Sequence, residues 1–165
     1  MASQALIKEF EQLLGKENVF SSEADCQTYS YDSAVLNPVV PAFVVRPTNT
    51  EQLGQCVSKL YENGIPMTVR GAGTNLSGGT IPDRSESVVI LTNGLNRILE
   101  INESDLYAVV ECGVVTADFA NAVAAKNLLY PPDPGSQSVS TIGGNIAENA
   151  GGLRGLKYGV TKDYL

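Results

Sequence analysis

The 165-residue sequence contains no histidine and no tryptophan. The absence of histidine excludes Ser-His-Asp and Cys-His nucleophilic catalysis, and any metal site built on imidazole, from this chain. The three cysteines, Cys26, Cys56 and Cys112, are far apart and show no CxxC spacing, so we expect neither a disulfide scaffold nor a metal site. Cys56 falls in a helical pattern and Cys112 in a strand pattern, and we interpret both as small buried hydrophobic residues. Any activity must therefore depend on a bound group.

Basic residues are also scarce, with 11 Lys+Arg against 18 Asp+Glu and a formal net charge of −7. This acidic excess, spread over both halves, argues against nucleic acid as a partner. No stretch approaches the roughly 18–20 uninterrupted apolar residues of a membrane span. The acidic amphipathic start, MASQALIKEFEQLL, differs from the basic and then apolar start of a signal peptide. With 43% hydrophobic residues, the composition predicts a cytoplasmic globular domain.

The first 36 residues are expected to form a helical arm. Apolar residues at helical spacing predict a helix over residues 3–15, with Ser3 as its N-cap and Gly15 at its end. A short second helix is predicted from Ser22, where Ser-Glu-Ala-Asp has the spacing of a capping box. Such an arm serves either as a docking element or, as we favour, as a cover for one edge of the core.

Residues 37–97 read as a small α/β subdomain. Apolar runs predict strands at residues 39–45, 65–69 and 88–92, and a helix capped by Thr50 continues to Tyr61. A strand, a helix and a second strand in this order imply parallel pairing with right-handed connections.

Residues 98–165 differ from this pattern. Strand-like runs at 98–102 and 108–113 flank a polar turn and predict an antiparallel hairpin. A helix over residues 116–127 follows, for which Thr116 and Asp118 are the expected caps. We therefore expect an α+β fold in which a parallel α/β subdomain precedes a mixed or antiparallel one.

A glycine-rich loop, residues 70–79 (RGAGTNLSGG), directly follows the second predicted strand. Glycine permits positive φ and close backbone approach, so successive N–H groups can converge on an anion such as a pyrophosphate. Thr74, Asn75 and Ser77 add neutral donors. The loop lacks the Gly-Lys-Ser/Thr of a P-loop, and Leu76 stands where the dinucleotide fingerprint needs its third glycine. A purely structural turn is the alternative.

A second segment, residues 131–159, holds seven of the 16 glycines and three of the eight prolines. In PPDPGS (131–136) the prolines fix φ and form a stiff wall, and in STIGGNIAENAGG (140–152) the glycines leave room for a planar group. Ser, Thr and Asn side chains can serve the edge heteroatoms of such a group. The alternative is a proline-braced connection with helix caps at Thr141 and Asn149.

Together these motifs resemble the FAD-linked oxidases with the fold of p-cresol methylhydroxylase and vanillyl-alcohol oxidase. Within them the sequence is most similar to the glycolate oxidase D subunit and the D-lactate and D-2-hydroxyglutarate dehydrogenases. The resemblance is carried by PAFVVRP (41–47) with the helix after it, by the loop 70–79, and by 131–159, which ends in GGLRGLKYG. It runs from about residue 20 to the end of the chain.

The resemblance implies residues that would hold FAD. The pyrophosphate would be wrapped by Gly71, Ala72, Gly73, Thr74, Asn75, Leu76 and Ser77. The flavin and its ribityl chain would be flanked by Pro132, Asp133, Gly135, Ser136, Thr141, Gly143, Gly144 and Asn145. Many relatives attach FAD covalently through a histidine at the loop position that Thr74 fills here, so we expect noncovalent binding.

Further candidates lie between Glu148 and Tyr158. Asn149 is a candidate contact to the isoalloxazine. Arg154 is a weaker candidate for an anionic substrate or the flavin, with a surface or interdomain ion pair as the alternative. Glu148 and Tyr158 are minor acid–base candidates, and no catalytic residue is assigned.

The implied activity is oxidation of a small D-2-hydroxy acid, glycolate or D-lactate, by hydride transfer to the flavin. Electrons would leave to an iron–sulfur or membrane acceptor subunit. A UDP-N-acetylenolpyruvoylglucosamine reductase has a similar phosphate loop, but residues 131–134 and 151–159 fit it poorly. A noncatalytic subunit that keeps the fold, and an anion-binding module unrelated to flavin, are further alternatives.

The family's chain continues beyond this length, through further strands of the FAD domain and a cap domain that usually supplies the catalytic histidine. We therefore expect Leu165 to lie within the FAD domain and the 165-residue chain alone to be inactive. An unpaired sheet edge would favour a homodimer or a distorted second half.

Overall fold

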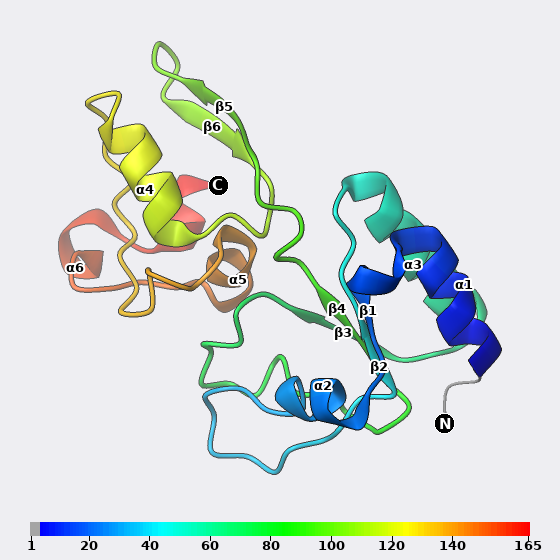
Figure 1. Cartoon of the computed structure of the whole chain (residues 1–165). Helices are drawn as coiled ribbons and strands as arrows, with labels where there is room; N and C mark the ends of the chain where they lie inside the picture. The colour runs from blue at the N-terminus through cyan, green and yellow to red at the C-terminus, as the bar shows by residue number, and fades with distance from the viewer. Residues whose placement is uncertain (1–3) are drawn as a thin grey trace. The chain divides into compact units, whose positions relative to one another are not determined.

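The structure, a computed structural model, describes residues 4–165, so the predicted cap Ser3 lies outside the described residues. The chain forms two compact units, one ending at Gly94 and one running from Leu95 to Leu165 (Figure 1). The first unit contains α1 (Gln4–Leu14), the 3₁₀ helix η1 (Lys16–Asn18), β1 (Val19–Phe20), α2 (Glu23–Thr28), β2 (Phe43–Val45), α3 (Thr50–Glu62), β3 (Met67–Arg70) and β4 (Val88–Leu91). The second contains β5 (Ile98–Asn102), β6 (Tyr107–Val110), α4 (Thr116–Ala124), α5 (Ile142–Glu148), α6 (Gly155–Tyr158) and the 3₁₀ helix η2 (Thr161–Tyr164). Within residues 4–165, no helix is long and apolar enough to cross a membrane.

The first unit is built on a four-stranded sheet with the order β1-β2-β4-β3. β2 and β3 both pair with β4 in parallel, which confirms the predicted parallel pairing. The two-residue strand β1 pairs with β2 antiparallel and was not predicted. Every residue of β2 and β4 is buried, which is why these strands read in the sequence as unbroken apolar runs.

Side chains cover both faces of this sheet. On one face, a core cluster joins strand residues to α1 and α3 and consists of Leu6, Phe10, Leu14, Val19, Phe43, Val45, Cys56, Leu60, Val88 and Ile90. On the other face, Val44, Val89 and Leu91 pack with Phe20 and Tyr29. Because successive side chains of a strand point to opposite faces, the strands contribute to two separate apolar layers.

The first predicted strand is shorter than expected, because only Phe43–Val45 of residues 39–45 joins the sheet. Pro41 has no N–H to donate to a strand ladder. The N–H of Val39 donates instead to the carbonyl of Ser30, at 2.9 Å, outside the sheet. The apolar run therefore extends beyond the strand.

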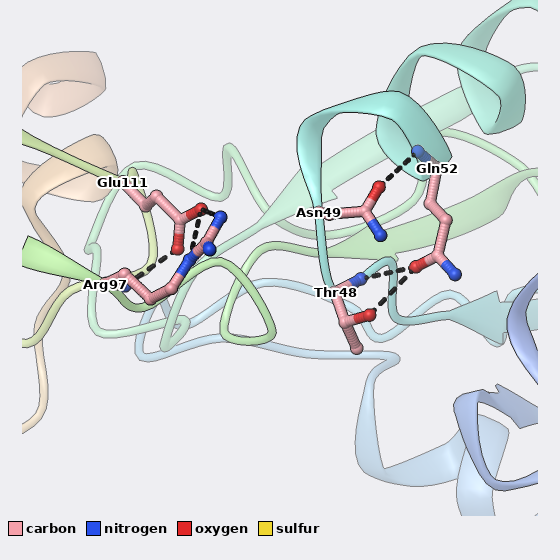
Figure 2. Close-up of polar contacts among 5 residues, drawn as sticks. All are labelled: Thr48, Asn49, Gln52, Arg97 and Glu111. Atoms are coloured by element: carbon pink, nitrogen blue, oxygen red, sulfur yellow. Dashed lines mark hydrogen bonds and ion pairs between the residues drawn. The ribbon is translucent and has the colours of Figure 1, made fainter. Parts of the chain in front are cut away.

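The cap of α3 is Asn49, and the prediction of Thr50 was wrong by one position (Figure 2). The side-chain oxygen of Asn49 accepts from the Gln52 N–H at 2.9 Å. The Gln52 side chain in turn accepts from the N–H of Thr48 at 2.9 Å. Several residues in this stretch can cap a helix, and only backbone geometry decides which one does. The predicted cap of α2 is confirmed, since Ser22 accepts from the N–H of Asp25.

The second unit contains the predicted antiparallel hairpin, formed by β5 and β6. Its core cluster is made of Val114, Phe119, Val123 and Ile142, with partly buried residues of the hairpin packed against it. The hairpin and α4 therefore share one small apolar core.

The predicted caps of α4 were wrong. The cap position is Val115, which supplies no side-chain hydrogen bond, and the helix ends at Ala124 and not at residue 127. The hydroxyl of Thr116 donates to the carbonyl of Ser140 at 3.0 Å, while Asp118 lies within the first turn. Thr116 is therefore used to hold a distant segment.

The cysteines fall in different environments. Cys26 and Cys56 are buried, whereas Cys112 is half-buried and lies two residues beyond β6, so its assignment to a buried strand was wrong. Burial raises the pKa of the Cys56 thiol to about 11, which keeps it protonated and unreactive. Within the described chain, no disulfide joins any of the three.

Candidate functional site

The glycine-rich loop begins at Gly71, directly after the last residue of β3, and reaches β4 without an intervening helix. Gly73 and Gly78 adopt φ values of +68° and +79°, which disfavour any residue with a Cβ. A Cβ at Gly73 would overlap the guanidinium of Arg70, and one at Gly78 would overlap Leu36. The positive φ therefore favours glycine at both positions, and a side chain there would also displace the end of Arg70 or of Leu36.

Most backbone N–H groups of this loop have no hydrogen-bond acceptor within the described part of the protein. The N–H groups of Gly71, Ala72, Gly73, Thr74 and Leu76 donate to no other group within residues 4–165. Consecutive N–H groups of this kind, held in a loop with positive φ, form the concave donor sets that bind anions. The loop can therefore donate several hydrogen bonds to one phosphate group.

Two polar side chains of the loop form hydrogen bonds within the protein. The amide of Asn75 donates to the carboxylate of Asp32 at 2.7 Å and to the hydroxyl of Ser77 at 3.1 Å. The Ser77 hydroxyl also accepts from the N–H of Gly79. Asn75 and Ser77, which we had expected to add donors for a ligand, thus brace the loop.

Two charged residues beneath the loop escaped sequence reasoning, Arg70 and Asp32. Both are buried, at 8% and 6% exposure. Burial disfavours the Asp32 carboxylate, but hydrogen bonds from Ala34, Asn75 and Thr80 outweigh it and hold its pKa below the usual value. Asp32 is therefore ionised at neutral pH. Arg70 was visible in the sequence as the residue before the glycines, but nothing in the spacing of Asp32 marked it.

In the second unit, the prolines of residues 131–136 form a buried wall, since Pro131, Pro132 and Pro134 are all buried. Asp133 turns toward Arg154, whose N–H donates to its carboxylate at 3.1 Å. A Cβ at Gly152 would overlap the backbone of Asp133. This stretch is therefore fixed by contacts with residues about 20 positions further along the chain.

Helix α5 begins at the second group of predicted residues. The Thr141 hydroxyl caps it by accepting from the Gly144 N–H at 3.2 Å. Asn145 is only 2% exposed, and its amide donates to the Thr116 hydroxyl at 2.8 Å. A Cβ at Gly143 would lie 2.7 Å from that of Cys112. Here the polar side chains and the glycines serve internal packing.

Gly135 and Ser136 lie in the turn after the proline wall. A Cβ at Gly135 would meet no atom within 4 Å, so this glycine borders open space. The Ser136 carbonyl accepts from the N–H groups of Val139 and Ser140, which closes the turn.

The residues beyond α5 are mostly exposed. Asn149 ends the helix in the left-handed conformation, with φ +49°, and its side chain accepts from the Lys162 N–H at 3.0 Å. Arg154 forms an ion pair with Asp133 at 3.5 Å and its side chain is half exposed. Glu148 and Tyr158 lie at the surface. The ion pair that we had weighed for Arg154 is thus present within this unit.

The fold is shared with solved structures of other proteins. The chain matches an alkyldihydroxyacetonephosphate synthase with a TM-score of 0.88 at 18% identity, covering 99% of this chain and 32% of that one. It matches p-cresol methylhydroxylase with substrate bound with a TM-score of 0.77 at 23% identity, covering 90% of this chain and 30% of that one. These likenesses confirm the predicted p-cresol methylhydroxylase-type α+β fold.

Residues 41–165 match the family model described as FAD binding domain, and the chain belongs to this family. The family confirms FAD as the cofactor. Among curated relatives, the glycolate oxidase subunit GlcD of Bacillus subtilis (strain 168) is 46% identical over 165 residues, all of this chain and 35% of that protein. A D-lactate dehydrogenase of Anaerostipes hadrus is 35% identical over 161 residues, 97% of this chain and 33% of that protein. The chain spans about a third of the length of these relatives.

Proposed function

We propose that this chain binds FAD noncovalently and that its glycine-rich loop holds the pyrophosphate. The observation that carries the proposal is the set of N–H groups between Gly71 and Leu76 that have no acceptor within the described residues. The chain that holds them belongs to an FAD-binding family. Fixed backbone dipoles suit a pyrophosphate even in an acidic protein, because they attract the anion without adding a mobile charge. Thr74 offers no imidazole for a covalent link to the flavin.

We assign the flavin end of the cofactor to the second unit. The buried prolines near Pro132 hold this segment rigid, and the open space at Gly135 leaves room beside it. Thr141 caps the start of α5, Gly143, Gly144 and Asn145 lie in its first turn, and Asn149 caps its end, so we assign all five to the flavin end through this short helix. A rigid, preorganised surface reduces the ordering cost of binding a planar ring.

We further propose that the protein oxidises a small D-2-hydroxy acid, glycolate or D-lactate. Relatives that cover nearly all of this chain carry the names glycolate oxidase subunit and D-lactate dehydrogenase. Bound FAD would supply the hydride-accepting chemistry, and the chain's own residues would bind and orient it. The word subunit in the relatives' names supports a separate partner, for which we propose an electron acceptor with an iron–sulfur centre or at a membrane. We also propose that the protein lies in the cytoplasm.

The absorption spectrum of the purified chain, mixed with excess FAD and then freed of unbound flavin, tests cofactor binding. We expect flavin bands that stay with the protein and that acid precipitation releases into the supernatant. Colour that remained in the acid pellet would contradict noncovalent attachment, and a colourless protein would contradict FAD binding by this chain.

The substrate proposal is tested on the complete protein as its gene encodes it. We expect glycolate or D-lactate to bleach the flavin bands under anaerobic conditions, whereas L-lactate, the matched control, leaves them unchanged. Flavin bands that no 2-hydroxy acid bleaches would contradict the proposed substrate class while leaving FAD binding intact.

A further inference from the structure

The segment between α2 and β2 lies beneath the glycine-rich loop of the same unit. The Tyr31 carbonyl accepts from the Arg70 guanidinium at 2.6 Å, and the Ser33 hydroxyl donates to the Gly73 carbonyl at 3.4 Å. Between them, Asp32 accepts from Asn75. All three residues of this segment precede residue 41, where the match to the FAD-binding family model begins.

Asp32 makes the most contacts with the loop. One carboxylate oxygen accepts from the Ala34 N–H at 2.8 Å, which orients the carboxylate from its own segment. The other oxygen accepts from the Asn75 amide at 2.7 Å and from the Thr80 hydroxyl at 3.2 Å. A single buried carboxylate thus fastens the loop at its middle and at its end, five residues apart.

Arg70 balances the charge of this carboxylate. Its guanidinium donates to the Thr80 hydroxyl at 3.3 Å and lies 5.7 Å from the centre of the Tyr29 ring. The same guanidinium fills the space that a side chain on Gly73 would need. A buried carboxylate is stable only when donors and a cation surround it, so the shape of the loop and the charge of Asp32 depend on each other.

We propose that Asp32 is a positioning residue. It holds the loop, before the cofactor binds, in the conformation that leaves these N–H groups available to an anion. The inference rests on the proposed function, since it concerns the loop that would take the FAD pyrophosphate. Loops that are ordered in advance bind more tightly because the ordering entropy is not lost on binding. Asp32 touches the loop and would act through it.

The test compares Asp32→Ala with a matched control, Asn18→Ala. Asn18 is also a buried polar residue of the first unit, and it bonds to the Leu14 carbonyl at 2.8 Å and to Arg46 at 2.9 Å, away from the loop. Two quantities are measured on each chain: backbone ¹⁵N order parameters of residues 71–80 without FAD, and the FAD dissociation constant from quenching of flavin fluorescence.

For Asp32→Ala we expect order parameters of the loop to fall from about 0.85 to below about 0.6. We also expect the dissociation constant to rise at least about tenfold, the equivalent of about 1.4 kcal/mol. Asn18→Ala should lower the thermal midpoint and leave both quantities unchanged. Asp32→Asn keeps the shape of the side chain and one acceptor oxygen, so this variant should remain folded. We expect it to raise the FAD dissociation constant by less than Asp32→Ala does.

A folded Asp32→Ala or Asp32→Asn chain with an ordered loop and wild-type affinity would overturn the positioning role while leaving the proposed function intact. A wild-type chain that binds no FAD would overturn the proposed function, and the positioning role with it. The wild-type titration therefore tests FAD binding, and the comparison of variants tests the positioning role of Asp32.

Discussion

The two glycine-rich segments look alike in the sequence but are built in opposite ways. In the first segment the N–H groups of Gly71, Ala72, Gly73, Thr74 and Leu76 have no acceptor within the described residues, and the Asn75 side chain ties the loop to Asp32. In residues 131–159 the polar side chains cap helices and bridge segments, and glycines such as Gly143 and Gly152 allow backbones to pack closely. The first segment therefore leaves backbone N–H groups available, whereas the second uses its side chains and glycines for internal contacts.

Under the proposed function, the first segment would hold the pyrophosphate of FAD and the second would hold its flavin ring. A pyrophosphate is charged and needs several N–H donors directed at a small volume. A flavin ring is flat and needs a stiff surface more than it needs charge. Substitutions at glycines of the two segments should therefore damage stability and binding in different proportions.

The largest expected effect is on the second segment. Gly152→Ala places a Cβ against the backbone of Asp133, which cannot move aside as a side chain could. We expect a loss of about 3 kcal/mol or more in the free energy of unfolding, measured by urea denaturation followed by circular dichroism. The matched control is Gly135→Ala, where nothing lies within 4 Å, and it should change stability by less than about 0.5 kcal/mol. Equal losses in both variants would refute the close-packing account.

A smaller stability effect with a larger binding effect is expected in the first segment. Gly73→Ala combines a positive φ with contact against Arg70, whereas Gly64→Ala has a similar φ of +63° in open space. Both should lose about 1–2 kcal/mol through backbone strain. Only Gly73→Ala should also weaken FAD binding, by about tenfold or more in a fluorescence titration. If Gly64→Ala weakened binding as much, the loss would reflect stability alone.

The pH dependence of stability offers a third comparison, at Glu111 (Figure 2). Its buried carboxylate accepts from the Arg97 guanidinium at 2.7 Å and from the Arg97 N–H at 2.7 Å, and these bonds hold its pKa below the usual value. A carboxyl whose pKa is lower in the folded state stabilises the fold above its unfolded pKa of about 4.3, and this contribution is lost as pH falls.

We therefore expect Glu111→Gln to unfold at lower urea than the wild type at pH 7. The difference between the two urea midpoints should narrow as the pH drops below about 4.3 and passes the lowered pKa of Glu111 in the folded state. Urea midpoints measured across pH 3–7 on both chains check this expectation. A gap of constant size would show that the ion pair contributes nothing that depends on charge.

The smallest expected effect concerns Arg154. Its ion pair with Asp133 is half exposed, so Arg154→Ala should cost only about 0.2–1 kcal/mol. As a surface ion pair it should leave the FAD dissociation constant within about twofold of the wild type. A large loss of FAD affinity, with stability unchanged, would instead favour the alternative in which Arg154 contacts the flavin.

Much of the fold could be predicted because burial leaves a local pattern in the sequence. The apolar runs of β2 and β4, and the hairpin around residues 103–105, are determined by neighbours in the chain. The contact between Asp32 and Asn75 joins residues 43 positions apart and has no local signal. The hydrogen bond from the Asn145 amide to the Thr116 hydroxyl joins residues 29 positions apart and has no local signal either.

The most direct test of the central claim is a titration of the ¹⁵N-labelled chain with FAD, followed through its backbone amide resonances. We expect the largest shifts on the amides of Gly71, Ala72, Gly73, Thr74 and Leu76, whose N–H groups have no acceptor in the described chain. Binding that shifted amides elsewhere and left residues 71–76 unmoved would contradict the assignment of this loop to the pyrophosphate.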